Sequence, residues 1–75
     1  MKSSLNKAVS ILKEEHESRL HGAEIARERA QDGISPHENM EMATHLRYEA
    51  KGILSAIMII EKMKEYTQYD TVPTG

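Results

Sequence analysis

Apolar and polar residues alternate with helical spacing along the first part of the chain. One stripe, at alternating steps of four and three, consists of Leu5, Val9, Leu12, His16, Arg19, Ala23, Ala26 and Ala30. A second, weaker stripe consists of Ala8, Ile11, Ser18, Gly22 and Ile25. The first spacing is that of a coiled-coil-like seam, and most residues between the stripes are charged. The pattern predicts an amphipathic helix over residues 4–31.

A turn is predicted at residues 32–35, where the helical pattern stops. Gly33 favours the end of a helix because glycine readily adopts the left-handed conformation that closes the last turn. Ser35 suits the N-cap of a second helix, Pro36 suits its first position, and Glu38 suits the carboxylate of a capping box. Because the connection is short, we expect the two helices to fold back as an antiparallel hairpin.

The second helix is predicted over residues 36–67. Its seam consists of Ala43, Leu46, Ala50, Ile53, Ile57 and Ile60. In an antiparallel hairpin with this turn, facing residues should have numbers that sum to roughly 69. Ala23 then lies opposite Leu46, and Leu12 lies opposite Ile57.

Residues 53–60 are apolar at every position except Ser55. Wound as a helix, they cover all of its sides, and one partner helix shelters only one side. We therefore expect other copies of the chain to cover the rest, with Leu54, Met58 and Ile59 at the interface. The predicted fold is all-α: an antiparallel two-helix hairpin that self-associates into a four-helix bundle or a higher helical oligomer.

Length and composition limit the possible classes of protein. The chain has 75 residues, which suffices for one small domain, and it contains no Cys, Trp or Phe. Disulfides and thiolate metal sites are therefore excluded. Residues 70–75 have no helical pattern, and we expect a flexible tail there.

Charge and hydropathy narrow the classes further. The chain has 10 basic and 12 acidic residues, a net charge of −2, and this disfavours general nucleic-acid binding. No secretory signal is visible, and the apolar run is shorter than the roughly 20 residues that cross a bilayer. The sequence predicts a cytoplasmic protein that does not bind membranes.

His16 and Arg19 occupy seam positions where an aliphatic residue is typical. In a structural interpretation, Arg19 pairs with Glu49 across the hairpin, and the polar seam residues fix the register at some cost in stability. This is the interpretation that we favour.

In a functional interpretation, Arg19 instead contributes to a ligand site. Together with Arg47 and Lys51 it would form a positive pocket for a small anionic ligand such as a nucleotide, held between subunits. Tyr48 lies nearby in sequence and would stack on a base.

A metal site in the bundle is a further alternative. Di-iron and di-manganese bundles use Glu-x-x-His, which this chain lacks. It has Glu17 with His21 and Glu41 with His45, each four residues apart. Since Glu41 and His45 lie off the seam, we favour surface pairs and expect no metal site.

No motif of the chain indicates catalysis. There is neither a nucleophile in a Gly-x-Ser-x-Gly setting nor a glycine-rich phosphate loop, so we expect neither an enzyme nor a cofactor. Short helical chains that self-associate suit an inhibitor or adaptor that presents a helix face to a partner. We predict a non-catalytic interaction protein whose partners are itself and another protein. Sequestration of a small anionic ligand and a metal-binding bundle are the alternatives.

Overall fold

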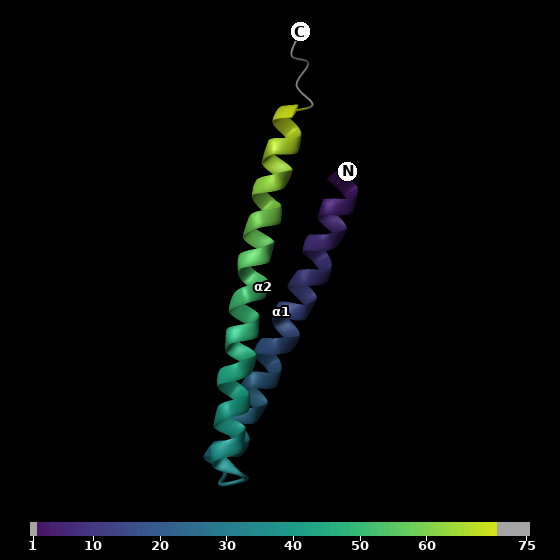
Figure 1. Cartoon of the computed structure of the whole chain (residues 1–75). Helices are drawn as coiled ribbons and strands as arrows, with labels where there is room; N and C mark the ends of the chain where they lie inside the picture. Colours follow the sequence, from purple (N-terminus) through teal and green to yellow (C-terminus); the bar gives the residue numbers. More distant parts are fainter. Residues whose placement is uncertain (1, 71–75) are drawn as a thin grey trace.

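The computed structural model describes the backbone of residues 2–70 and the side chains of residues 3–66. Over this range the chain forms two α-helices, α1 (Lys2–Gln31) and α2 (Pro36–Asp70), and no strand. The helices run antiparallel and are joined by a short turn at one end (Figure 1). The predicted all-α helical hairpin is confirmed. It is an elongated rod of 65 × 15 × 11 Å.

Both helices extend beyond the predicted boundaries. α1 begins at Lys2 instead of residue 4 and ends at Gln31, as predicted. α2 begins at Pro36, as predicted, and continues to Asp70. Boundaries read from a pattern are uncertain by a few residues because the last turns carry few seam positions. Of the predicted flexible tail, residues 71–75 lie outside the described residues.

The end of α1 is closed by backbone hydrogen bonds that require a glycine. Gly33 has a φ of 81°, in the left-handed region. Its N–H donates to the carbonyl of Ala30 (3.1 Å), and the N–H of Ile34 donates to the carbonyl of Arg29 (2.9 Å). This pair of bonds is a Schellman motif, which satisfies carbonyls that the helix itself leaves unpaired.

The start of α2 differs from the predicted capping box. The carbonyl of Ser35 accepts the first bond of the helix from the N–H of Asn39 (2.9 Å). Ser35 has a φ of 37°, whereas a capping residue normally has an extended backbone. Among the described side chains no hydrogen bond joins Ser35 to Glu38, so that prediction is wrong. Instead, Nδ2 of Asn39 donates to the carbonyl of Ile34 (2.6 Å).

The core lies along the two predicted seams. The buried hydrophobic residues are Val9, Ala23, Ala26, Ala43, Ala50 and Ile57. Ala23, Ala26 and Ala43 form one cluster, and Leu46 packs against it. The predicted register, with Ala23 near Leu46, is confirmed. Four of the six buried residues are alanines, so the core of a single chain is small.

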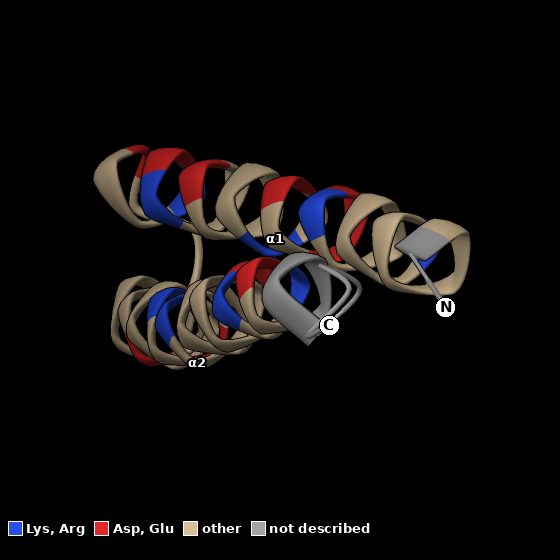
Figure 2. Ribbon diagram, turned by 90° about the horizontal axis from the view of Figure 1, so that it is seen from above, with Lys and Arg blue, Asp and Glu red and all other residues tan. Residues whose placement is uncertain are grey.

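The two helices are inclined to one another. Seen from the side they overlap near the turn, and seen from above they lie apart there (Figures 1 and 2). Such an inclination is expected of helices that pack through positions three and four residues apart. Acidic and basic residues occur along the length of both ribbons (Figure 2).

Candidate functional site

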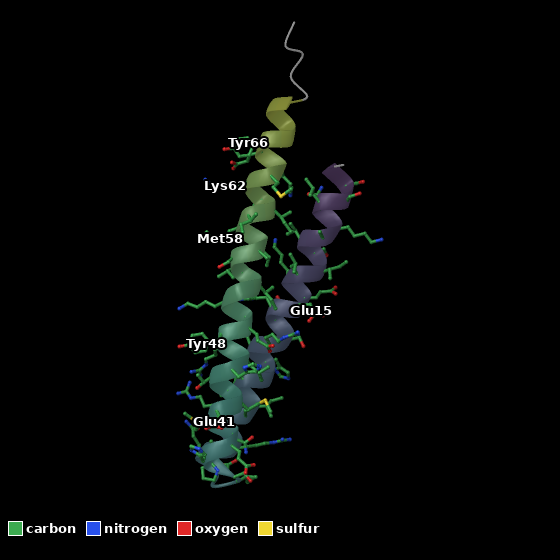
Figure 3. All side chains as sticks on the ribbon, in the orientation of Figure 1. Glu15, Glu41, Tyr48, Met58, Lys62 and Tyr66 are labelled. Carbon is green, nitrogen blue, oxygen red and sulfur yellow. The ribbon has the colours of Figure 1, made fainter. Side chains whose placement is uncertain are left out.

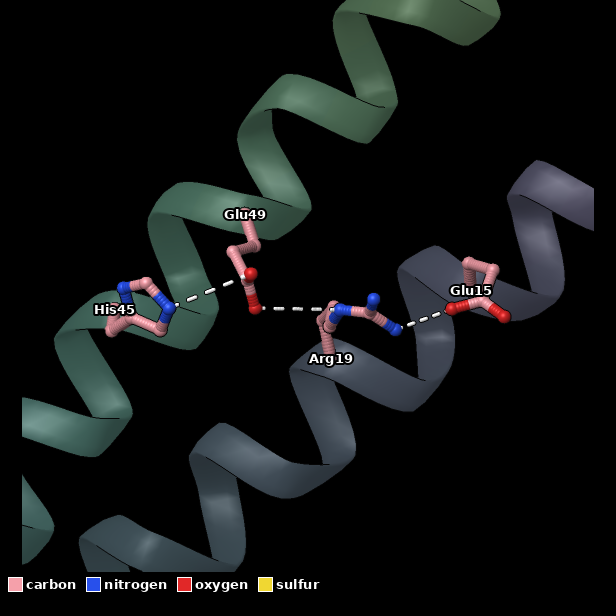
Figure 4. A network of polar contacts seen from close by, with 4 residues as sticks. All are labelled: Glu15, Arg19, His45 and Glu49. Carbon is pink, nitrogen blue, oxygen red and sulfur yellow. Dashed lines mark hydrogen bonds and ion pairs between the residues drawn. The ribbon is translucent and has the colours of Figure 1, made fainter.

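Arg19 bridges the two helices. Its guanidinium contacts the carboxylate of Glu15, one turn earlier on α1, and its Nε lies 3.4 Å from Oε1 of Glu49 on α2 (Figure 4). The other oxygen of Glu49 lies 3.5 Å from Nε2 of His45. We call these four residues the Arg19 network. The predicted pair of Arg19 and Glu49 is confirmed.

The Arg19 network is partly open to solvent. The side chain of Arg19 is 33 % exposed and that of Glu49 is 41 % exposed. Ion pairs at this exposure contribute roughly 0–1 kcal/mol each because water screens the charges. The network therefore contributes little to the stability of the hairpin.

A groove of about 450 Å³ lies beside the seam, and we call it the cationic groove. Its lining includes Leu20, Arg47, Tyr48, Ala50, Lys51 and Leu54. Three of the four predicted ligand-binding residues, Arg47, Tyr48 and Lys51, are thus brought together. Arg19 is not part of the lining.

The geometry of α2 explains why Arg19 is separate from the groove. Residues two apart on an α-helix point about 200° away from each other. Glu49, which pairs with Arg19, therefore faces away from Arg47 and Lys51, its neighbours at two positions before and after. By turning towards Glu49, Arg19 turns away from the cationic groove.

The three predicted interface residues are divided between two surfaces. Leu54, 44 % exposed, lines the cationic groove. Met58 and Ile59 line a second groove of about 340 Å³. This second groove, which we call the outer patch, is lined by Met58, Ile59, Lys62, Met63 and Tyr66. Figure 3 shows that Met58, Lys62 and Tyr66 point away from α1.

The candidate metal ligands are paired differently from the prediction. Glu41 lies 3.1 Å from Nε2 of His37, while His45 pairs with Glu49. The side chains of His37 and Glu41 are 87 % and 71 % exposed, as expected for a surface pair. Over residues 3–66, no group of three or more His, Asp or Glu side chains is placed to hold a metal ion.

Sequence reasoning did not identify the α1 side of the cationic groove. Leu20 lies in neither stripe, so the periodicity gave it no role. The available signal was an isolated leucine between two polar residues, four positions after His16, which also lines the groove. Residues four apart share a face of a helix.

In its described part, neither helix combines the length and the apolar character that a membrane span requires. Charged and polar side chains that could bind a ligand come together in two places, the Arg19 network and the cationic groove. These two places lie on different sides of the seam. Neither a family model, nor a curated protein, nor a solved structure matches this chain.

Proposed function

We propose that this protein is a small, non-catalytic interaction protein, an inhibitor or adaptor that self-associates and acts through a helical surface. The observation that carries the proposal is the outer patch, where Met58 is 63 % exposed, Ile59 is 62 % and Tyr66 is 69 %. Single exposed hydrophobic residues are common on protein surfaces. A contiguous group of large ones is typical of a surface that binds another protein.

The surface of the single hairpin supports a second copy of the chain as one partner. The chain exposes 5924 Å², and a compact monomer of its mass would expose about 4,700 Å². The surplus exceeds the roughly 800 Å² that one partner contributes to an interface of standard size. Two hairpins packed into a four-helix bundle would cover a surplus of this kind.

A charge in the outer patch tests self-association. We expect light scattering to give more than the 8.5 kDa of one chain for the wild type. Ile59→Glu should dissociate the assembly or unfold it, because the new carboxylate would be buried without a partner. Lys62→Glu in the same patch is the control: this position already carries a charge in the wild type, so the exchange should leave the mass unchanged. A wild type that is monomeric and cooperatively folded would refute the proposal. For Ile59→Glu, circular dichroism distinguishes a dissociated but helical protein from an unfolded one.

A second candidate function is sequestration of a small anionic ligand such as a nucleotide. It is favoured by one observation, that Arg47, Tyr48 and Lys51 line the same groove. A bound ligand stabilises the folded state by mass action, so a nucleotide that binds should raise the melting temperature. Arg47→Ala should abolish this rise, and Arg19→Ala should leave it in place.

A further inference from the structure

The cationic groove holds positive charge without negative charge beside it. Arg47 and Lys51 lie one turn apart on α2, and neither forms an ion pair with another described side chain. No acidic residue is part of the groove lining. On the other side of the seam, by contrast, Arg19 meets two carboxylates. Like charges at this spacing repel one another, so an anion that contacts both would be bound favourably.

The remainder of the groove presents aliphatic surface. Leu20 from α1 is 43 % exposed and Leu54 from α2 is 44 % exposed, while Ala50 between them is buried. The volume of about 450 Å³ lies within the range of roughly 300–1,000 Å³ that is typical of small-molecule sites. A ligand with an apolar body would cover this surface and exclude water from it.

We propose that the cationic groove binds one amphipathic organic anion, a molecule with an aliphatic chain or a ring and a single phosphate or carboxylate head. The head group contacts Arg47, whose planar guanidinium forms two parallel hydrogen bonds, and Lys51, which adds a point charge. The apolar body lies over Leu20 and Leu54. The proposal names the ligand class of the second candidate function and does not depend on self-association.

The lining favours an apolar body over a nucleobase. A nucleobase has polar edges that need hydrogen-bond partners in its site. The hydroxyl proton of Thr44, which lines the groove, is already donated to the carbonyl of Met40 (3.0 Å), and His16 and Tyr48 are the other uncharged polar side chains of the lining. The groove is also a concavity between two helices, which suits one dissolved molecule rather than the surface of a bilayer.

Calorimetric titration of the full chain tests the ligand class. The probe is decyl phosphate below its micelle concentration, compared with decanol, which lacks the charge, and with adenosine monophosphate, which lacks the chain. We expect decyl phosphate to bind at least tenfold more tightly than either. If decanol bound equally tightly, the charge of the phosphate would not be recognised. If the nucleotide bound equally or more tightly, the alkyl chain of decyl phosphate would not be recognised. Either result overturns the proposal.

Substitutions locate the binding site. Arg47→Gln and Lys51→Gln should each raise the dissociation constant of decyl phosphate by about tenfold, since each removes one charged hydrogen-bond donor. Lys62→Gln, which removes the lysine of the outer patch and leaves the cationic groove intact, is the matched control and should bind like the wild type. Circular dichroism verifies that each variant folds. Unchanged affinity in both groove variants would place the ligand elsewhere and overturn the proposal.

Two further measurements exclude other occupants of the groove. The fraction of protein that sediments with phosphatidylglycerol vesicles should be the same for the wild type and for Arg47→Gln. A smaller fraction for Arg47→Gln would indicate that the groove binds a membrane instead of a dissolved ligand. Leu54→Gln should weaken the binding of decyl phosphate without changing the mass of the protein particle in light scattering. A fall in mass would assign the groove to a second copy of the chain and overturn the proposal. If the cationic groove proves not to bind this ligand, self-association through the outer patch is still tested separately by Ile59→Glu.

Discussion

The half of the hairpin beside the turn and the half beside the termini are built from different side chains. Near the turn the buried seam residues are alanines, and a Cβ added to Gly22 would lie 3.1 Å from Cδ1 of Leu46. Towards the termini the buried residues are Val9 and Ile57. Small residues let two backbones approach, whereas large ones bury more apolar area. The turn half therefore fixes how the helices fit together, and the terminal half supplies more of the hydrophobic stabilisation.

The largest effect is expected in the terminal half. Ile57→Ala should lower the free energy of unfolding by about 2–5 kcal/mol, because it leaves a cavity in the seam. Ile57 is 7 % exposed, whereas Ile11 is 52 % exposed. Ile11→Ala is the control and should cost less than about 1 kcal/mol. Urea denaturation at one fixed protein concentration measures both, and equal losses would contradict the comparison.

A smaller effect is expected from overfilling the turn half. Ala23 is 2 % exposed, and a leucine in its place would force the helices apart. We expect Ala23→Leu to cost about 1–3 kcal/mol in the same denaturation experiment. Glu24→Leu, at the adjacent exposed position, should change stability by less than about 0.5 kcal/mol. A fully stable Ala23→Leu protein would show that the turn half is loosely packed.

Two glycines should respond with opposite signs. Gly33→Ala should destabilise the hairpin by about 1 kcal/mol or more, because alanine is disfavoured at the φ of 81°. A Cβ at Gly52 would meet nothing within 4 Å, in the interior of α2. Gly52→Ala should therefore stabilise the protein by about 0.5–1 kcal/mol. Melting curves of the two variants, one shifted down and one shifted up, are the expected outcome.

The smallest effect is expected at the boundary between the two halves, in the Arg19 network. A double-mutant cycle with Arg19→Gln and Glu49→Gln should give a coupling free energy of about 0–1 kcal/mol, since both side chains are partly exposed. A coupling well above this range would mean that the pair is shielded from water, as in the interface of an oligomer.

The hairpin and its register follow from the sequence by simple physical rules. Seam residues at steps of three and four predict which side of each helix is buried, and Gly33 predicts where the first helix stops. The pairing rule then places Ala23 near Leu46 and Arg19 within reach of Glu49. The structure has both contacts. These features depend on local spacing and on the length of the turn, both of which are visible in a single sequence.

The composition of the candidate site was only partly predictable. The pairing rule gives the level of a residue along the rod, but it does not say to which side of the seam a long side chain turns. Arg19 lies near the level of Arg47, yet its two carboxylate partners hold it on the other side. At the start of α2, similarly, Glu38 forms no hydrogen bond with Ser35, and the side chain that bonds the preceding turn is Asn39, which donates to the carbonyl of Ile34. Competition among several polar partners decides both cases.

The elongated shape has a consequence for hydrodynamic measurements. The radius of gyration is 17.7 Å, compared with about 11 Å for a compact globule of this length. An elongated particle experiences more friction than a sphere of equal mass, so a lone copy would elute from a sizing column ahead of globular standards. Its elution volume would therefore imitate that of a heavier species. Only a method that weighs the particle independently of its shape can count the chains.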